Sequence, residues 1–182
     1  MKFSVTIFLL FSVLFSCSSY SADLSFNTTP DLAAAEQHII SGTTAYIFQN
    51  GQKNIALLEQ SDALIGNFAH IDQKGSNNWV SALQAGDLNF VNIQQYGNDN
   101  ISNSQQTGIA NSINLTQNQN GNQFNAIQLG NNNVFNAIQN GNSIITMSAQ
   151  GNGNTISADL PAGTNYQINV VGDNVKASST GQ

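Results

Sequence analysis

The chain has 182 residues, enough for one domain with flanking tails. Only 8% of the residues are charged, with four Lys, no Arg and ten Asp plus Glu. Nucleic-acid binding needs a basic surface that neutralises phosphates, so this composition excludes it and disfavours an anionic membrane surface. Asn and Gln dominate the middle of the chain, a composition typical of either disordered or β-forming segments.

Residues 1–21 predict a signal peptide. Lys2 supplies a positive start, residues 3–15 are mostly apolar, and Ser19 and Ser21 are the small residues expected ahead of a cleavage site before Ala22. The apolar run is too short to span a bilayer, which takes about 20 residues. We therefore expect an exported chain with three Lys against ten acids, a net charge of −7.

Cys17, the one cysteine of the sequence, lies inside this segment. Residues 14–17 loosely resemble a bacterial lipidation motif, and the alternative is a cysteine that is discarded with the signal peptide. In either case the exported body has no disulfide and no cysteine metal site.

A repeat of eleven residues fills the middle of the chain. Eight of the nine intervals between its marker glutamines are eleven residues and one is thirteen. The glutamines are Gln49, Gln60, Gln73, Gln84, Gln95, Gln106, Gln117, Gln128, Gln139 and Gln150. Asn precedes most of them by six residues, at Asn54, Asn67, Asn78, Asn89, Asn100, Asn111, Asn122 and Asn133. Gly follows seven of them by two residues, at Gly51, Gly75, Gly86, Gly97, Gly108, Gly130 and Gly141. A fixed period of this kind indicates a repeat architecture.

Each unit predicts one strand and one turn. Positions −6, −4, −2 and 0 relative to the glutamine share one parity, so in an extended strand they point to one face. The unit is then a seven-residue strand followed by four residues, among which Gly or Asn permits a positive φ. The apolar period of two and the high Gly and Asn content exclude a helix.

Identical columns in every unit favour an all-β, parallel two-sheet β-solenoid over a meander of hairpins. Two strands form a coil of 22 residues, and ten strands make about five coils. Stacked about 4.8 Å apart, each Asn or Gln would donate to one neighbour and accept from the other, as in the amide ladders of cross-β fibrils. Apolar residues fill a thin core, with Phe124 and Phe135 on consecutive strands.

These columns resemble the curlin repeat, as in QNGQKNIALLEQ (49–60) and QKGSNNWVSALQ (73–84), over about residues 43–150. The resemblance implies a secreted, non-enzymatic subunit of curli, the extracellular amyloid fibres of Gram-negative biofilms, with a role in adhesion. It implies no cofactor and no small-molecule substrate. The implied partners are further copies of the chain, a second curlin subunit, and an outer-membrane secretion pore with its accessory proteins.

Within this family the sequence is closer to the minor subunit, which nucleates polymerisation at the cell surface. Most strands begin with Asn and the spacing is almost uniform, whereas the major subunit typically begins alternate strands with Ser. The C-terminal repeat departs from the minor subunit because it lacks the usual basic residues. The alternatives are a major fibre subunit and a non-amyloid extracellular β-solenoid adhesin.

The segments that flank the repeats are less regular. Residues 22–42 are interpreted as a secretion address, and the alternatives are a disordered tail or a helical cap over Asp31–His38. Residues 151–182 are interpreted as a degenerate repeat or cap, in which 165–178 either form another strand or remain loose. Pro161 cannot donate a ladder hydrogen bond, so we expect it to end the regular stack.

An uncapped end of such a stack presents unpaired backbone groups, to which another chain can add as a strand. We therefore expect templated addition at the Thr43–Gln60 coil, the Asn133–Gln150 coil, or both. The register slips by one residue after Gln150, because Asn154 and the alternate positions that follow it continue one residue early.

Outward positions carry apolar residues that suggest lateral fibre contacts or another partner. They are Tyr46, Phe48, Ile55, Leu57, Phe68, Trp79, Leu83, Phe90, Val134, Ile138, Ile145 and Met147. Charged residues in or beside turns are expected to limit self-association. They are Asp62, Asp87, Asp99, Lys53 and Lys74.

Catalysis has one candidate pair in the sequence. His70 and Asp72 stand outward at i and i+2, and an incidental surface pair is the competing interpretation. The sequence shows no Cys/His metal set, phosphate-binding loop or nucleophile motif. We therefore predict a protein that is not an enzyme.

Overall fold

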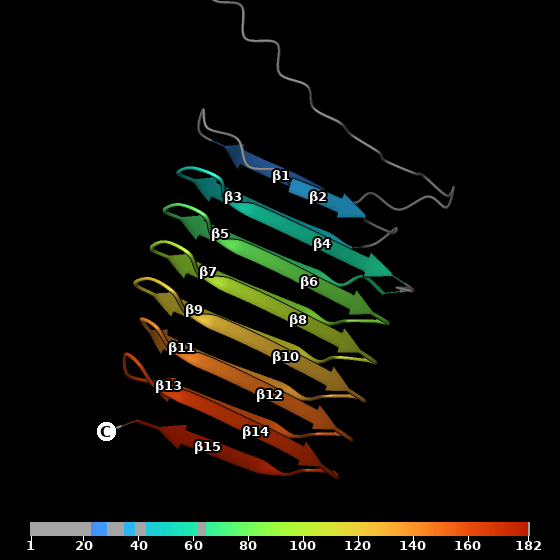
Figure 1. Ribbon diagram of the computed structural model, residues 1–182. Coiled ribbons are helices and arrows are strands. Elements are labelled where there is room, and N and C mark those ends of the chain that lie inside the picture. Colours follow the sequence, from blue (N-terminus) through green and yellow to red (C-terminus); the bar gives the residue numbers. More distant parts are fainter. Residues whose placement is uncertain (1–22, 29–34, 39–42, 62–64, 182) are drawn as a thin grey trace, which may run out of the picture.

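Successive strands alternate between two parallel sheets that face each other, so the chain winds as a β-solenoid (Figure 1). The structure is a computed structural model, and it describes residues 23–28, 35–38, 43–61 and 65–181. The expected signal peptide with Cys17, and also Asp62, lie outside the described residues.

The odd-numbered strands form one sheet, here called the odd sheet, in the order β1-β3-β5-β7-β9-β11-β13-β15. They are β1 (Asp23–Thr28), β3 (Thr44–Asn50), β5 (Phe68–Lys74), β7 (Phe90–Tyr96), β9 (Ser112–Asn118), β11 (Val134–Asn140), β13 (Thr155–Leu160) and β15 (Lys176–Thr180). The even-numbered strands form the even sheet, in the order β14-β12-β10-β8-β6-β4-β2. They are β2 (Ala35–His38), β4 (Ile55–Ser61), β6 (Trp79–Ala85), β8 (Ile101–Thr107), β10 (Gln123–Leu129), β12 (Ile144–Gln150) and β14 (Asn165–Val171).

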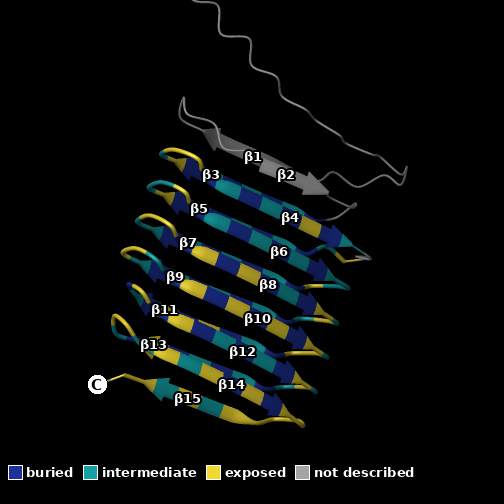
Figure 2. Ribbon diagram, viewed as in Figure 1, coloured by how far each residue is buried: buried dark blue, intermediate teal, exposed yellow. Residues whose placement is uncertain are grey.

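All the strand pairs of both sheets are parallel and in register, so the predicted fold class is confirmed. Buried and less buried residues alternate along strands such as β6 and β9, which appears as bands across the stack (Figure 2). The inward residues form one core cluster between the sheets, and both Phe124 and Phe135 are fully buried in it.

Each regular strand begins one residue later than the columns predict. In the unit around Gln95 the strand is Phe90–Tyr96, and Asn89 stands just ahead of it. Asn89 is nevertheless fully buried, and its Nδ2 donates to the backbone oxygen of Gly108 at 2.9 Å. The inward Asn is therefore a corner residue that fixes the turn, and not the first residue of the strand.

The regular connectors use two positive φ angles, of which the sequence indicated the first. Gly97, two residues after Gln95, has a φ of 127°. Two residues further on, Asp99 has a φ of 58° in the left-handed region. Residues with a side chain hold this second position in other connectors, at Lys53, Asn77, Leu88, Ala110 and Asn132. Lys, Leu and Ala do not favour this conformation, which costs them about 1–2 kcal/mol, so at Lys53, Leu88 and Ala110 the stack imposes it.

The stack is longer than the five coils predicted from the glutamines. Strands β3 to β14 alone make six two-strand coils, and β13, β14 and β15 continue both sheets in parallel register. The expectation that Pro161 ends the stack is wrong. Pro161 directly follows β13, so it lies in a connector and removes no hydrogen bond of the ladder. Within residues 165–178, the alternative of a further strand is confirmed by β14 and the start of β15.

The stack also extends toward the N-terminus. β1 pairs with β3, and β2 pairs with β4. Residues 35–38 are therefore strand, and the helical alternative for Asp31–His38 is wrong there because this segment forms backbone pairs with a neighbouring strand. Neither coil predicted as an end is the end of the described stack, since β1 and β2 precede one and β13–β15 follow the other.

A connector shortened by one residue reverses the faces of β12. Three residues lie between Gln139 and the next buried corner, Ser143, where four are usual. Ile145, Met147 and Ala149 consequently point inward and are buried. The prediction that Ile145 and Met147 face outward is wrong for this reason.

The same shift removes Gln150 from the glutamine column. Ala149, not Gln150, stands opposite Gln128, while Gln150 pairs with Leu129 and is exposed. The assignment of Gln150 to an amide ladder is therefore wrong. The spacing of eleven is kept here because Gln150 is the seventh residue of β12, whereas Gln139 is the sixth residue of β11.

Gly97→Ala is expected to destabilise the solenoid strongly. An added Cβ would lie 2.0 Å from the backbone oxygen of Gln119 in the next coil, so two coils would have to separate. We expect a loss of about 3 kcal/mol or more in the free energy of unfolding, measured by urea denaturation followed by circular dichroism. Gly163→Ala is the control, because a Cβ there meets open space, and only the left-handed backbone cost of about 1–2 kcal/mol remains. Equal losses in the two variants would contradict this account of the connectors.

Candidate functional site: amide ladders and solenoid ends

Nine of the predicted glutamines form two buried, hydrogen-bonded ladders, one along each sheet. In each ladder, Nε2 of one glutamine donates to Oε1 of the glutamine in the following coil. The odd-sheet ladder joins Gln49, Gln73, Gln95, Gln117 and Gln139 over 2.6, 2.8, 2.8 and 2.9 Å. The even-sheet ladder joins Gln60, Gln84, Gln106 and Gln128 over 2.7, 3.0 and 2.9 Å.

The glutamine amides also join the two sheets to each other. Nε2 of Gln95, besides its bond to Gln117, donates to the backbone oxygen of Trp79 in the opposite sheet at 3.0 Å. The same cross-sheet bond is made by Gln73, Gln84, Gln106, Gln117, Gln128 and Gln139. Both N–H groups of an interior amide are thus used, which avoids a desolvation cost of about 1–3 kcal/mol for a buried unpaired group. Sequence periodicity gave no sign of this second bond.

The asparagine ladders run in the opposite direction. Nδ2 of Asn100 donates to Oδ1 of Asn78 in the preceding coil at 3.1 Å. The pairs Asn78–Asn54, Asn122–Asn100, Asn111–Asn89 and Asn133–Asn111 repeat this bond at 3.0, 3.0, 3.1 and 3.1 Å. Asn67 joins its column through a bond that the other asparagines also make, because its Oδ1 accepts the backbone N–H of Asn89 at 2.8 Å.

A third row of polar contacts runs along the connectors. It was not predicted from the sequence. Oδ1 of Asn98 accepts the backbone N–H of Ser76 at 2.8 Å, and the N–H of Asn98 donates to Oδ1 of Asn120 at 2.8 Å. Asp87 likewise accepts the N–H of Ile65 at 2.9 Å. The available signal was the recurrence of Asn or Asp at the third position after the glutamine. Asp87 therefore stabilises a turn, beside its predicted role in limiting self-association.

The catalytic candidates His70 and Asp72 bind different partners. Nδ1 of His70 lies 2.9 Å from Oδ1 of Asn92. Asp72 forms an ion pair with Lys74 at 2.9 Å and accepts a hydrogen bond from the Tyr96 hydroxyl at 3.3 Å. The hydrogen bond to Asp72 raises the pKa of Lys74, and burial, followed by the Asp72 charge, raises the pKa of Tyr96. These contacts are those of an ion pair on the outer face in which Lys74 is exposed and Asp72 is largely buried.

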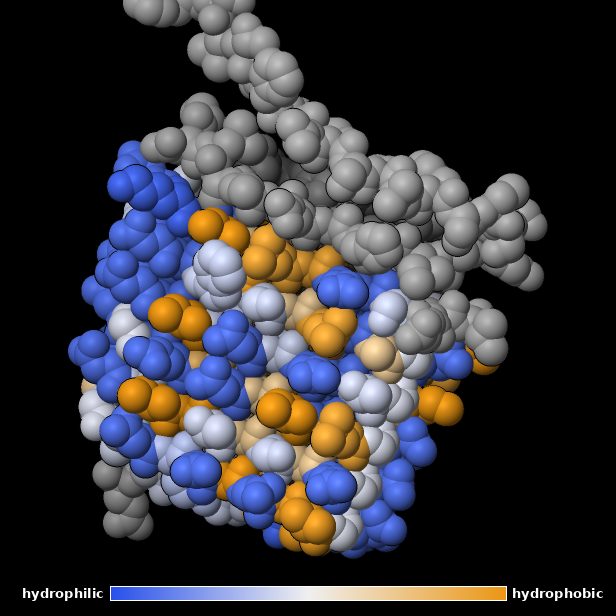
Figure 3. Space-filling model, turned by 45° about the vertical axis from the view of Figure 1, so that its right-hand side comes forward, coloured by the Kyte–Doolittle hydropathy of each residue, from blue (hydrophilic) through white to orange (hydrophobic). Residues whose placement is uncertain are grey.

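Apolar side chains occur on the outer faces but do not merge into one patch in the view shown. Figure 3 shows hydrophobic side chains set among hydrophilic ones on a broad face. On the odd sheet, Tyr46, Phe68 and Phe90 form an aromatic row, with ring centroids 5.8 and 5.1 Å apart. Lateral contacts of these faces stay a prediction.

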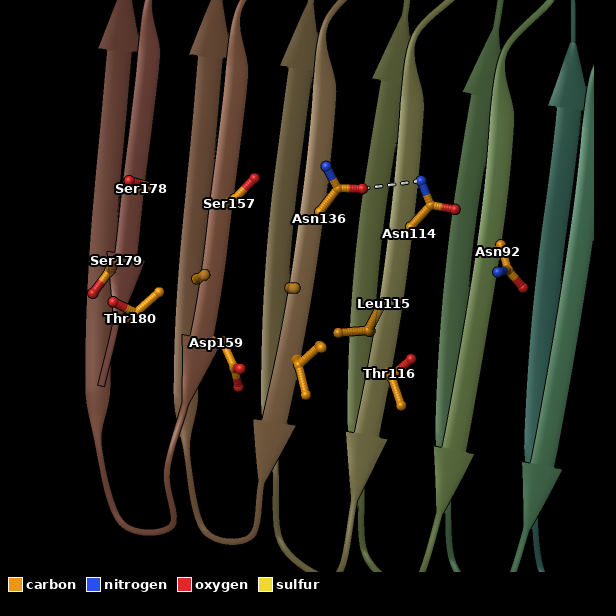
Figure 4. Close-up of a pocket in the computed structure, with 13 residues that line it drawn as sticks. Asn92, Asn114, Leu115, Thr116, Asn136, Ser157, Asp159, Ser178, Ser179 and Thr180 are labelled. Atoms are coloured by element: carbon orange, nitrogen blue, oxygen red, sulfur yellow. Dashed lines mark hydrogen bonds between the residues drawn. The ribbon is translucent and has the colours of Figure 1, made fainter. Parts of the chain in front are cut away.

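An open groove of about 350 Å³ lies on the outer face of the odd sheet. Figure 4 shows its polar lining, in which Nδ2 of Asn114 donates to Oδ1 of Asn136 at 3.2 Å. Asp159 is the one ionisable side chain among the described lining residues, whereas glycoside hydrolysis uses a pair of carboxyl groups. Within the described part of the chain, no cluster of three His, Cys, Asp or Glu suits a metal. A helix long and apolar enough to cross a membrane is likewise not found there.

The sequence profile of the curlin associated repeat matches residues 66–97. The match to this repeat is thus shown for residues 66–97. The match contains β5, β6 and β7 with their connectors, and the strands on either side keep the same register. This repeat belongs to curli subunits and is structural and non-enzymatic. Comparisons with curated proteins and with solved structures found no match.

Gln95→Leu is expected to destabilise the solenoid. The substitution removes a ladder amide and leaves the buried Oε1 of Gln117 without its donor. We expect a loss of about 2–5 kcal/mol in the free energy of unfolding, measured by urea denaturation. Gln94→Leu is the matched control, because Gln94 is the neighbouring outward residue of β7, and its effect should stay within about 0.5 kcal/mol. A similar loss in both variants would argue against the ladders as the source of stability.

Alkaline pH is expected to weaken the cluster of Asp72, Lys74 and Tyr96. Both raised pKa values mean that the folded chain holds the protons of Lys74 and Tyr96 more tightly, so their stabilisation is complete below about pH 10 and lost above it. The unfolding midpoint should therefore fall as the pH rises above about 10. The Lys74→Met/Tyr96→Phe variant should show a smaller fall over the same range, and an unchanged fall would refute the assignment.

Proposed function

We propose that this chain is a subunit of extracellular curli-type amyloid fibres and that it nucleates their polymerisation at the cell surface. The observation that carries the proposal is the stack of glutamine ladders, which repeats the same buried hydrogen bonds from coil to coil. Hydrogen-bonded amide ladders and parallel in-register strands are also what hold cross-β fibrils together. A fibre would therefore repeat, between chains, the ladder and strand hydrogen bonds that already join the coils within this chain.

The proposed mechanism is templated strand addition. Edge strands of a solenoid present backbone N–H and C=O groups at the spacing that an added strand needs. An incoming chain with the same coil length extends both sheets and both kinds of ladder together. The proposed partners are therefore further copies of the chain or a second curlin subunit, after export through an outer-membrane pore with accessory proteins.

The proposed nucleating role rests on how regular the coils are, whereas the fibre role rests on the ladders alone. Asn at nearly every corner and almost uniform connectors make the coils from β5 to β11 close to identical. A surface with a single, fixed hydrogen-bonding pattern is suited to template a less regular chain. A major fibre subunit is the competing role, since it would use the same ladders for its own elongation.

Seeding kinetics test the proposal. The chain from Ala22 to Gln182 is expected to shorten the lag of a major curlin subunit in thioflavin T assays, because it supplies a preformed coil. The product should give a fibre reflection near 4.7 Å from stacked strands. Assembly of the chain without cross-seeding would instead favour a major subunit. A stable monomer that neither assembles nor seeds would refute the amyloid function and leave a β-solenoid adhesin.

A further inference from the structure

The glutamine ladders begin with two unpaired acceptors. Gln49 and Gln60 are the first members of their ladders and are 5% and 0% exposed. The Oε1 atom of each has no hydrogen-bond partner among the residues that the structure describes. In the interior, the corresponding atom of Gln95 accepts from Gln73 at 2.8 Å. The N-terminal end of each ladder therefore lacks one donor that a further glutamine would supply.

Strands β1 and β2 lie over this end without completing the ladders. The register places Thr28 opposite Gln49. β2 ends at His38, opposite Glu59, one residue before Gln60. β1 therefore provides backbone pairing at Gln49, and β2 pairs with β4 only up to Glu59, yet both buried oxygens remain unpaired. A coil that offers backbone pairing and glutamine donors together satisfies more of the buried polar groups, so it is favoured over β1 and β2.

The C-terminal end of each ladder is closed. Nε2 of Gln128 donates to the backbone oxygen of Ser112 at 3.0 Å, and that of Gln139 donates to Gln123 and Ser143 at 2.8 and 2.9 Å. Residues without an amide then take over the two columns. Ala149 follows Gln128 and is followed by Val170, while Leu160 follows Gln139.

We infer that this chain templates a fibre from its N-terminal end only, and that its partner is a different repeat chain that carries glutamine through its last coil. The inference rests on the proposed function and gives it a direction and a partner. A second copy stacked end to end would bring Val170 and its apolar neighbours to the open ladders, so the oxygens of Gln49 and Gln60 would stay unpaired. A chain with glutamine in its last coil brings two Nε2 donors, displaces β1 and β2, and leaves the C-terminal end as a cap.

The test uses a probe that carries glutamine in every coil. Tandem copies of residues 111–132, a coil with Gln117 and Gln128, provide such a polypeptide. The chain from Ala22 to Gln182 is added as a seed, and thioflavin T reports the elongation rate. Gln49→Leu/Gln60→Leu should lower the seeding rate about tenfold for each acceptor lost.

The matched control removes the other end of the same ladders. Gln128→Leu/Gln139→Leu loses two ladder bonds, as does Gln49→Leu/Gln60→Leu. Its seeding rate should fall less than that of Gln49→Leu/Gln60→Leu, because both substitutions lie far from the N-terminal end. Equal loss of seeding in both double variants would overturn the end assignment, because it would reflect general destabilisation.

Two further readouts address the cap directly. A biotin attached after Gln182 and marked with streptavidin–gold should stay at fibre tips, whereas gold within fibres that grow on both sides would contradict the inference. Val170→Gln supplies an amide at the C-terminal end, and it should raise the rate at which the chain adds to its own copies about tenfold.

These outcomes separate the inference from the function on which it rests. If neither the unsubstituted chain nor any variant seeds the probe, the proposed function fails. If the unsubstituted chain and Gln49→Leu/Gln60→Leu seed it equally, only the assignment of the N-terminal end fails.

Discussion

The structure depends on the buried glutamine amide, which forms a hydrogen bond along the stack and another across to the opposite sheet. The amide of Gln95 donates to Gln117 in the next coil and to Trp79 in the opposite sheet. Both bonds exist together only when the strands are parallel, in register and separated by whole coils. An insertion is therefore confined to a connector: the interval of thirteen residues between Gln60 and Gln73 leaves the Gln60–Gln84 bond intact at 2.7 Å. The same amides set the coil length, the sheet spacing and the pattern that an added chain must match.

The glutamine and asparagine ladders run in opposed directions, so their amide dipoles offset each other. Gln95 donates toward the C-terminal end of the stack, whereas Asn100 donates toward the N-terminal end. Aligned amides in one column add their dipoles from coil to coil, and a neighbouring column of the opposite sense offsets that field. Because corner asparagines also bind the connector backbone, as Asn78 does with Gly97 at 2.8 Å, their direction is fixed by the turn. A stack of any length can therefore grow without accumulating a large dipole.

Periodicity predicted the fold class, the inward columns and most ladder members. Side chains alternate along a strand, so a repeated register determines which residues point inward in every coil. It failed where a connector changed length without changing the spacing. Gln150 keeps the interval of eleven, yet the short turn before Ser143 moves it to the surface and brings Met147 inside. It also missed the left-handed residues such as Leu88, whose conformation is imposed by neighbouring coils and has no local signal. The pairing of β1 with β3 was equally invisible, since it is a backbone contact made by a sequence outside the repeat.

The central claim is that each glutamine bonds to the glutamine one coil away in the same chain, and solid-state NMR measures this most directly. Chains carrying isotope labels at the side chains of Gln95 and Gln117 are diluted into unlabelled chain before assembly. The structure places Nε2 of Gln95 2.8 Å from Oε1 of Gln117, so a strong nitrogen–carbon contact between these side chains is predicted to survive dilution. A contact that disappears on dilution would show that glutamines stack only between chains, as in a flat in-register amyloid, and would contradict the solenoid.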